Sequence, residues 1–138
     1  MNLSFIVIDN SDLDCYIAKK LIKRVFPKMQ VKHFLAAAEA LEHIGKDAGS
    51  VSENSTIIIL DLLMPQMNGF EFIEAFELLP LAIQKNYYVV VLTTILDKRD
   101  LDKVLRYTSV HGILDKPITS EKISGIIYDI IPEFKNME

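Results

Sequence analysis

Five short apolar runs along the chain have the composition of buried β-strands. Three of them, FIVI, IIIL and YYVVVL, are continuous rather than alternating with polar residues. Continuous runs are typical of parallel strands that are buried on both faces. We therefore predict five strands, at Leu3–Ile8, Met29–Phe34, Thr56–Leu60, Tyr87–Thr93 and Gly112–Leu114.

Segments with helical periodicity separate and follow these runs. In each segment apolar residues recur every three or four positions, which places them on one face of a helix. The clearest example follows the first run and consists of Leu13, Ile17, Leu21 and Val25. The pattern predicts five helices, one after each strand.

Polar residues that favour helix starts precede three of these segments. Ser11 with Asp14 three residues later resembles a capping box. Asn68-Gly69 can start the third helix. Either of two hydroxyl residues can cap the fifth, Thr119 or Ser120.

Strand and helix therefore alternate five times. This alternation predicts an α/β fold with a mainly parallel sheet and right-handed crossovers. The length suits one domain, residues 1–138, with a frayed tail at about 132–138. Asp47–Ser55 is the clearest surface loop, whereas Pro80–Asn86 either extends the third helix or forms a separate turn.

Composition narrows the class of protein. Half of the residues are hydrophobic and a quarter are charged, which is ordinary for a soluble globular domain. A net charge of −4 gives no reason to expect nucleic-acid binding. The lone cysteine, Cys15, fits a reducing cytosol. The early acidic residues argue against a signal peptide, and no apolar run approaches the roughly 20 residues of a membrane span. We expect a cytoplasmic protein.

Polar residues collect where the predicted strands end. Asp9, Asp61, Thr93 and Lys116 each fall at or just after a strand end. Parallel sheets of this type bind ligands outside the carboxyl ends of their strands, so these side chains are expected to converge.

The chemistry of this set can be argued directly. Two carboxylates about 5 Å apart repel by roughly 3 kcal/mol at an effective dielectric near 20, and a hard cation such as Mg²⁺ relieves that repulsion. A carboxylate can also attack a phosphoryl group, and a cation, a lysine and a hydroxyl stabilise the charge that develops.

Each residue alone also has a plain structural explanation. An Asp after a strand is often only a turn residue or a helix cap. Thr93 alone suits a strand end, and Lys116 alone suits a solvated surface. The combination favours a functional site, because all four follow strands that run the same way.

The motifs around these residues resemble the response-regulator receiver domain. The matching stretches are IIILDLLMPQMNGFEFI, FIVIDN, VVVLTT and ILDKP, in the family's order and over nearly the whole chain. The resemblance implies a doubly wound, flavodoxin-like (βα)5 fold with a five-stranded parallel sheet in the order 2-1-3-4-5.

The resemblance also implies a role for each site residue. Asp61 corresponds to the phospho-acceptor, and Asp9 to a ligand of Mg²⁺. The backbone carbonyl of Leu63 corresponds to a further metal ligand. Thr93 and Lys116 correspond to the hydroxyl and the amine that contact the phosphoryl group, and Lys116-Pro117 matches a peptide that is often cis in the family.

Three departures from the family pattern modify these expectations. Asn10 stands where the family usually has a second acid, so we expect weaker Mg²⁺ binding, with Asn10 a weak metal ligand. Ile113 replaces the aromatic ring that turns inward on activation. Leu63 and Ile95 flank the phosphate position and cannot orient water, which predicts a long-lived phosphoryl group.

The leading hypothesis is a two-component or phosphorelay receiver, not an enzyme in the ordinary sense, although it takes part in its own phosphotransfer and slow dephosphorylation. A histidine kinase or a histidine phosphotransfer protein would supply the phosphoryl group. A protein partner would read the result through about residues 97–131, and the chain would be a monomer or a phosphorylation-dependent dimer.

Two alternatives remain. A pseudo-receiver would bind partners without phosphorylation, as Asn10 and Ile113 suggest. An aspartyl phosphatase of a related α/β type usually has a second Asp two residues after its nucleophile, and Leu63 stands there instead.

Overall fold

The computed structural model describes residues 2–46, 54–64, 66–94 and 97–136. Its centre is a parallel sheet in the order β2-β1-β3-β4-β5. The strands span Asn2–Ile8 (β1), Gln30–Phe34 (β2), Asn54–Asp61 (β3), Tyr87–Thr93 (β4) and Val110–Asp115 (β5). All five predicted strands are present, and the expected sheet order is confirmed.

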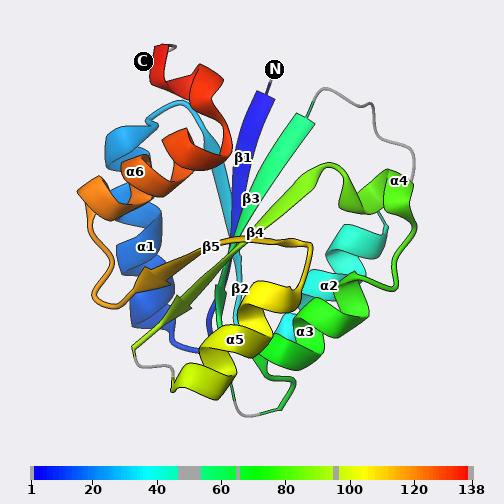
Figure 1. Cartoon of the computed structure of the whole chain (residues 1–138). Coiled ribbons are helices and arrows are strands. Elements are labelled where there is room, and N and C mark those ends of the chain that lie inside the picture. The colour runs from blue at the N-terminus through cyan, green and yellow to red at the C-terminus, as the bar shows by residue number, and fades with distance from the viewer. Residues whose placement is uncertain (1, 47–53, 65, 95–96, 137–138) are drawn as a thin grey trace.

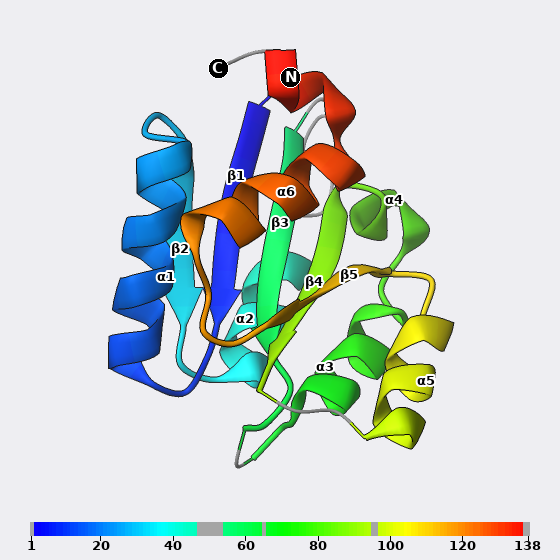
Figure 2. The same cartoon turned by 60° about the vertical axis from the view of Figure 1, so that its left-hand side comes forward.

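Helices cover both faces of the sheet (Figures 1 and 2). One face carries α1 and α6, and the other carries α2, α3, α4 and α5. Their bounds are Asp12–Val25 (α1), Ala37–Gly45 (α2), Gly69–Phe76 (α3), Leu81–Gln84 (α4), Lys98–Arg106 (α5) and Ser120–Ile130 (α6). In the described ranges, no helix combines the length and apolar character that crossing a membrane would require.

Alternation of side chains along the strands divides the core into two layers. In β1, Phe5 and Val7 pack in the layer below α1 and α6, whereas Ile6 and Ile8 pack in the layer below α2 and α3. The buried middle of each central strand is therefore a continuous apolar run, since successive side chains enter opposite layers. This arrangement explains the continuous runs in the sequence.

The structure decides one alternative that the sequence left open, and it differs from the sequence expectations in other details. Pro80 separates α3 from a short α4, so Pro80–Asn86 does not extend the third helix. The strand β3 begins at Asn54, inside the predicted Asp47–Ser55 loop, while residues 47–53 lie outside the described part of the chain.

The C-terminal segment also differs from the sequence expectation. Residues Pro132–Asn136 form a 3₁₀ helix (η1) rather than a frayed end, because the Phe134 side chain is buried in the core layer of α1 and α6. An apolar anchor of this kind gives a short terminal segment a fixed place, despite its polar neighbours.

Candidate functional site

The strand register brings the four predicted polar residues to one edge of the sheet. Ile8 pairs with Leu60, Asp61 with Leu92, and Thr93 with Asp115, so the four strands end at nearly the same level. Asp9 and Lys116 directly follow β1 and β5. The predicted convergence at the carboxyl edge is therefore confirmed.

Lys116 lies at the centre of this group. Its Nζ atom is 3.5 Å from Oδ2 of Asp9 and 3.6 Å from Oδ2 of Asp61. A third carboxylate, Oδ2 of Asp14 on α1, lies 3.4 Å from the same nitrogen. The ammonium therefore contacts acids from three separate elements of the fold.

Backbone amides fix the other oxygens of the two strand-end acids. The Ser11 N–H donates to Oδ1 of Asp9 at 3.0 Å, and the Leu63 N–H donates to Oδ1 of Asp61 at 3.1 Å. Each carboxylate is thus held by the loop that follows it. Its second oxygen is directed toward Lys116.

Burial and charge shift two ionisation equilibria in the site. Burial raises the pKa of Asp9, and the nearby Asp61 and Asp14 raise it further, against the Ser11 N–H and Lys116, which lower it. Burial lowers the pKa of Lys116, but the three carboxylates outweigh this effect and raise the pKa overall. Lys116 is therefore a cation at neutral pH, and further positive charge beside Asp9 would favour its ionised form.

Thr93 contributes a hydroxyl that is unused within the described residues. The residue is buried, and none of the described groups forms a hydrogen bond with its Oγ1 atom. Its backbone carbonyl accepts a 2.9 Å hydrogen bond from the Lys116 N–H, next to a cis Lys116-Pro117 peptide. A buried hydroxyl without a partner is costly, which favours a ligand oxygen as the missing partner. The cis peptide agrees with the sequence expectation.

The loop after Asp61 is shaped by a close backbone approach. A Cβ atom on Gly69 would lie 2.7 Å from the Leu62 Cα atom, so only glycine fits there. The Gly69 N–H donates to the Leu62 carbonyl at 3.0 Å. Asn68 and Glu71 then form a complete capping box at the start of α3. The Asn-Gly pair of the sequence motif thus ties the segment after Asp61 to α3.

Two of the residues that depart from the family pattern, Asn10 and Leu63, closely follow the strand-end acids Asp9 and Asp61 in the chain. Asn10 is exposed, and Leu63 is 66% exposed. Ile113 is half-buried in β5 beside the core layer of α2 and α3. Ile95 lies outside the described residues. At the described positions, the departing residues are therefore neutral or apolar.

The donor set fits a magnesium ion. Two carboxylates, a backbone carbonyl such as that of Leu63 and water are the hard oxygen ligands that Mg²⁺ accepts. The unpartnered Thr93 hydroxyl adds a donor for a phosphoryl oxygen. In the part of the chain that the structure describes, no group of three or more His, Cys, Asp and Glu residues is arranged to hold a metal.

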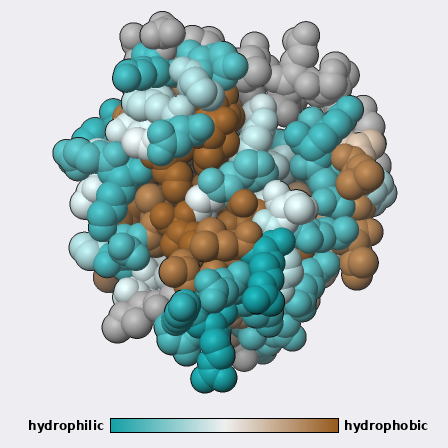
Figure 3. Space-filling view, viewed as in Figure 1, coloured by the Kyte–Doolittle hydropathy of each residue, from teal (hydrophilic) through white to brown (hydrophobic). Residues whose placement is uncertain are grey.

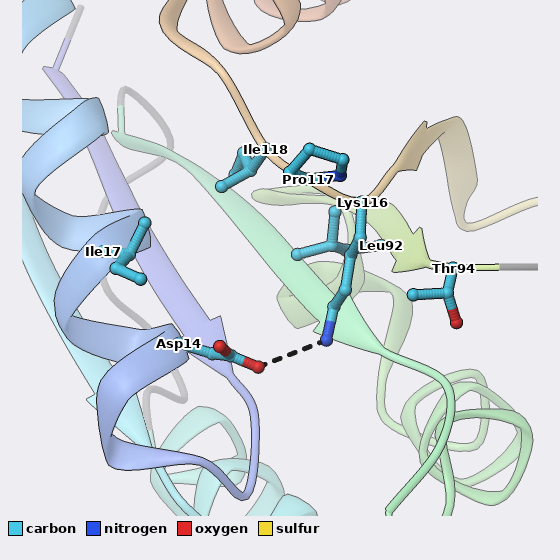
Figure 4. Close-up of a pocket in the computed structure, with 7 residues that line it drawn as sticks. All are labelled: Asp14, Ile17, Leu92, Thr94, Lys116, Pro117 and Ile118. Atoms are coloured by element: carbon cyan, nitrogen blue, oxygen red, sulfur yellow. Dashed lines mark hydrogen bonds and ion pairs between the residues drawn. The ribbon is translucent and has the colours of Figure 1, made fainter.

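A cavity of about 300 Å³ opens beside Lys116 (Figure 4). Its walls are mainly apolar and come from α1, β4 and the segment after β5, and they consist of Asp14, Ile17, Leu92, Thr94, Lys116, Pro117 and Ile118. In Figure 4 the Asp14 carboxylate and the Lys116 ammonium point toward each other across one side of it. The cavity is therefore mainly apolar with this ion pair on one side, and Asp9, Asp61 and Thr93 are not among the residues that line it.

Asp14 is the site residue that the sequence prediction missed. Its position after Ser11 suggested a helix-capping role, and only the folded chain brings its carboxylate to Lys116. The sequence did contain one indication of this contact: Asp14 is an acid in the first turn of the helix that follows the strand-end acid Asp9.

A doubly wound parallel sheet with an acidic pair and a lysine at its carboxyl edge defines a flavodoxin-like domain with a switch-point site. The family model for the response regulator receiver domain matches residues 5–128. The chain therefore belongs to the response regulator receiver family, a family of signalling domains in two-component systems.

Solved structures agree with this assignment. A response regulator receiver protein from Dyadobacter fermentans is 25% identical, with a TM-score of 0.80 and coverage of 92% of this chain and 96% of that one. A two-component response regulator from Cytophaga hutchinsonii is 22% identical, with a TM-score of 0.80 and coverage of 95% and 98%. The chemotaxis protein CheY4 of Vibrio cholerae is 21% identical, with a TM-score of 0.76 and coverage of 95% and 100%; the last two likenesses support the fold. No curated protein matches the sequence.

Proposed function

We propose that this chain is a receiver that accepts a phosphoryl group on Asp61 from a phosphohistidine and passes the signal to a separate protein. The observation that carries the proposal is the contact of Lys116 with both Asp9 and Asp61, at 3.5 and 3.6 Å, beside a buried hydroxyl without a described partner. In the proposal, residues 1–138 form one cytoplasmic receiver domain.

In the proposed transfer, a carboxylate oxygen of Asp61 attacks phosphorus. The new O–P bond forms as the P–N bond to the donor imidazole breaks, and the electron pair stays on the imidazole nitrogen, which takes up a proton. The Leu63 N–H orients the Asp61 carboxylate for the attack. Lys116 and the Thr93 hydroxyl then contact the transferred oxygens.

Mg²⁺, when bound, neutralises charge on the reacting oxygens. Asp9, Asp61 and the Leu63 carbonyl would hold it, with Asn10 as a weaker ligand. Asp9 suits this role because its raised pKa reflects burial without enough positive charge nearby.

The reading surface in this proposal lies on α5, β5 and α6, within residues 97–131. Figure 3 shows a hydrophobic area between α5 and α6 over β5. Leu101 and Leu105 on α5 are exposed, and Ile113 and Ile126 are half-buried nearby. An apolar area of this kind fits a protein partner or a phosphorylation-dependent dimer.

The test is the intact mass after incubation with acetyl phosphate and Mg²⁺. We expect the gain of one phosphoryl group, its loss in Asp61→Asn, and its persistence in Asp115→Asn, which removes an exposed strand-end acid as a matched control. If the mass of the wild-type protein does not change, the phospho-acceptor proposal is wrong.

A phosphorylation-independent pseudo-receiver is the second candidate. The exposed, neutral Asn10 in place of an acid favours it. The same mass measurement distinguishes the two, because a pseudo-receiver gains no phosphoryl group while keeping the fold.

A further inference from the structure

The start of α1 forms only half of a capping box. The Ser11 hydroxyl accepts a 3.2 Å hydrogen bond from the Asp14 N–H, as a capping box requires. The return bond would join the Asp14 carboxylate to the Ser11 N–H, but that N–H donates to Asp9 instead. At the start of α3, by contrast, Asn68 and Glu71 form both bonds. The Asp14 carboxylate is therefore available for another contact.

That contact is Lys116, which follows a strand on the other side of the site. Oδ2 of Asp14 lies 3.4 Å from the ammonium, as close as the two strand-end acids. Figure 4 shows the two side chains directed toward each other. The Asp14 side chain is 44% exposed, whereas that of Asp9 is 3% exposed. Asp14 thus pairs with Lys116 from the solvent side.

The charges around Lys116 give this pairing a functional meaning. Position 10 carries a neutral amide, so the strand end itself supplies one carboxylate fewer than the family pattern has. Asp14 restores a third carboxylate one helical turn later. We propose that Asp14 is a positioning residue that holds the Lys116 ammonium beside Asp61 in readiness for phosphotransfer, an inference that rests on the proposed function.

The exposure of Asp14 explains how it can hold Lys116 and still release it. Water screens the attraction of a half-exposed carboxylate more than that of a buried one. A phosphoryl group on Asp61 would add negative charge near the buried Asp9 carboxylate. Lys116 would then exchange its contact with Asp14 for one with the phosphoryl oxygens.

The first experiment compares phosphorylation rates with acetyl phosphate and Mg²⁺. Asp14→Asn keeps the size and the N–H contact to Ser11 but removes the charge, and we expect a roughly tenfold slower gain of mass, as for outer-shell partners of other sites. Asp12→Asn is the matched control, because Asp12 is an exposed acid in the same first turn. Its rate should stay within about twofold of wild type, since surface charges contribute little. Circular dichroism checks that both variants fold.

The second experiment observes Lys116 without metal or phosphodonor. The protein carries ¹³C-labelled lysine, and the NMR signal of the Lys116 Cε atom is assigned by its loss in Lys116→Arg. This signal should shift in Asp14→Asn and should keep its position in Asp12→Asn. An unchanged phosphorylation rate or an unchanged Lys116 signal in Asp14→Asn overturns the role of Asp14. Failure of the wild-type protein to gain a phosphoryl group overturns the proposed function and this role together. Normal loading of wild type and Asp14→Asn alike overturns this role alone.

Discussion

The Tyr107 hydroxyl donates a 2.6 Å hydrogen bond to Oε2 of Glu74, and this bond joins the end of α5 to α3. Close by, the Ser109 N–H and hydroxyl both donate to Oε2 of Glu77. Val104 is the buried residue of α5 among those described. Polar contacts therefore add to a small apolar contact in fixing this helix, which forms part of the proposed reading surface.

Tyr107→Phe removes the hydrogen bond and should lower the free energy of unfolding by about 0.5–1 kcal/mol, since the pair is partly exposed. Burial, together with the hydrogen bond and charge of Glu74, raises the pKa of Tyr107 from 10.0 to about 12. The neutral phenol is thus favoured in the folded state. The contribution of the neutral Tyr107 side chain to the free energy of unfolding is complete below pH 10 and is lost as the pH rises through about 12.

Urea unfolding at neutral pH and between pH 10 and about 12 checks this prediction, with the exposed Tyr16→Phe as control. Wild type should lose more stability over the alkaline range than Tyr107→Phe. An equal alkaline loss in the two proteins would contradict the prediction.

Asn10→Asp should strengthen Mg²⁺ binding. The new carboxylate would add negative charge at the edge of the acidic pair, and we expect roughly tenfold higher affinity, about 1.4 kcal/mol, because the position is exposed and partly screened. Isothermal titration calorimetry measures the effect. Unchanged affinity in Asn10→Asp would show that the amide does not limit metal binding.

Slow loss of phosphate is expected from loaded protein, because the exposed residue two positions after Asp61 is the apolar Leu63, which cannot orient a water molecule. Leu63→Asn should shorten the lifetime several-fold by giving that water a hydrogen-bond partner. Leu78→Asn is the control, since Leu78 is also exposed but follows the far end of α3. Mass spectra taken over time give the lifetime, and loss within seconds from wild type would refute the expectation.

Ile113→Tyr should increase the response of α5 to phosphorylation, because the resemblance leads us to expect an aromatic ring at this position of β5. The readout is the change in amide NMR shifts at Leu101 and Leu105 on loading with acetyl phosphate, with Ile113→Leu as control. Equal shift changes in the three proteins would mean that the missing ring does not limit coupling.

The sheet could be predicted because its strands are buried on both sides. FIVI and IIIL enter two core layers at once, so their sequences carry an unbroken apolar signal. The strand β5 was predicted three residues too short, since its ends include the polar His111 and Asp115. Its pairing with β4 also shifts register between Val89 and Val90, which no local pattern indicates.

The core of the candidate site could also be predicted, because a strand-end residue in a parallel sheet has one edge to occupy. Asp14 could not, because its contact depends on a competition for the Ser11 N–H. Asp9 forms that hydrogen bond, which leaves Asp14 for Lys116. The partner that Asp14 then contacts, Lys116, is distant in sequence and reaches Asp14 only in the folded chain. Likewise, Phe134 anchors η1 through a core that the local sequence does not describe.

The surroundings of Cys15 have a practical consequence. Its thiol is buried and donates a 3.4 Å hydrogen bond to the Asp9 carbonyl, and burial, with help from nearby carboxylates, raises its pKa to about 11. The thiolate is the form that attacks alkylating reagents, so the native cysteine should react slowly at neutral pH. A cysteine introduced on the exposed surface of α5 would then be the fast-reacting thiol of the molecule. A fluorophore placed there could follow loading of the acceptor acid in real time without removal of the native residue.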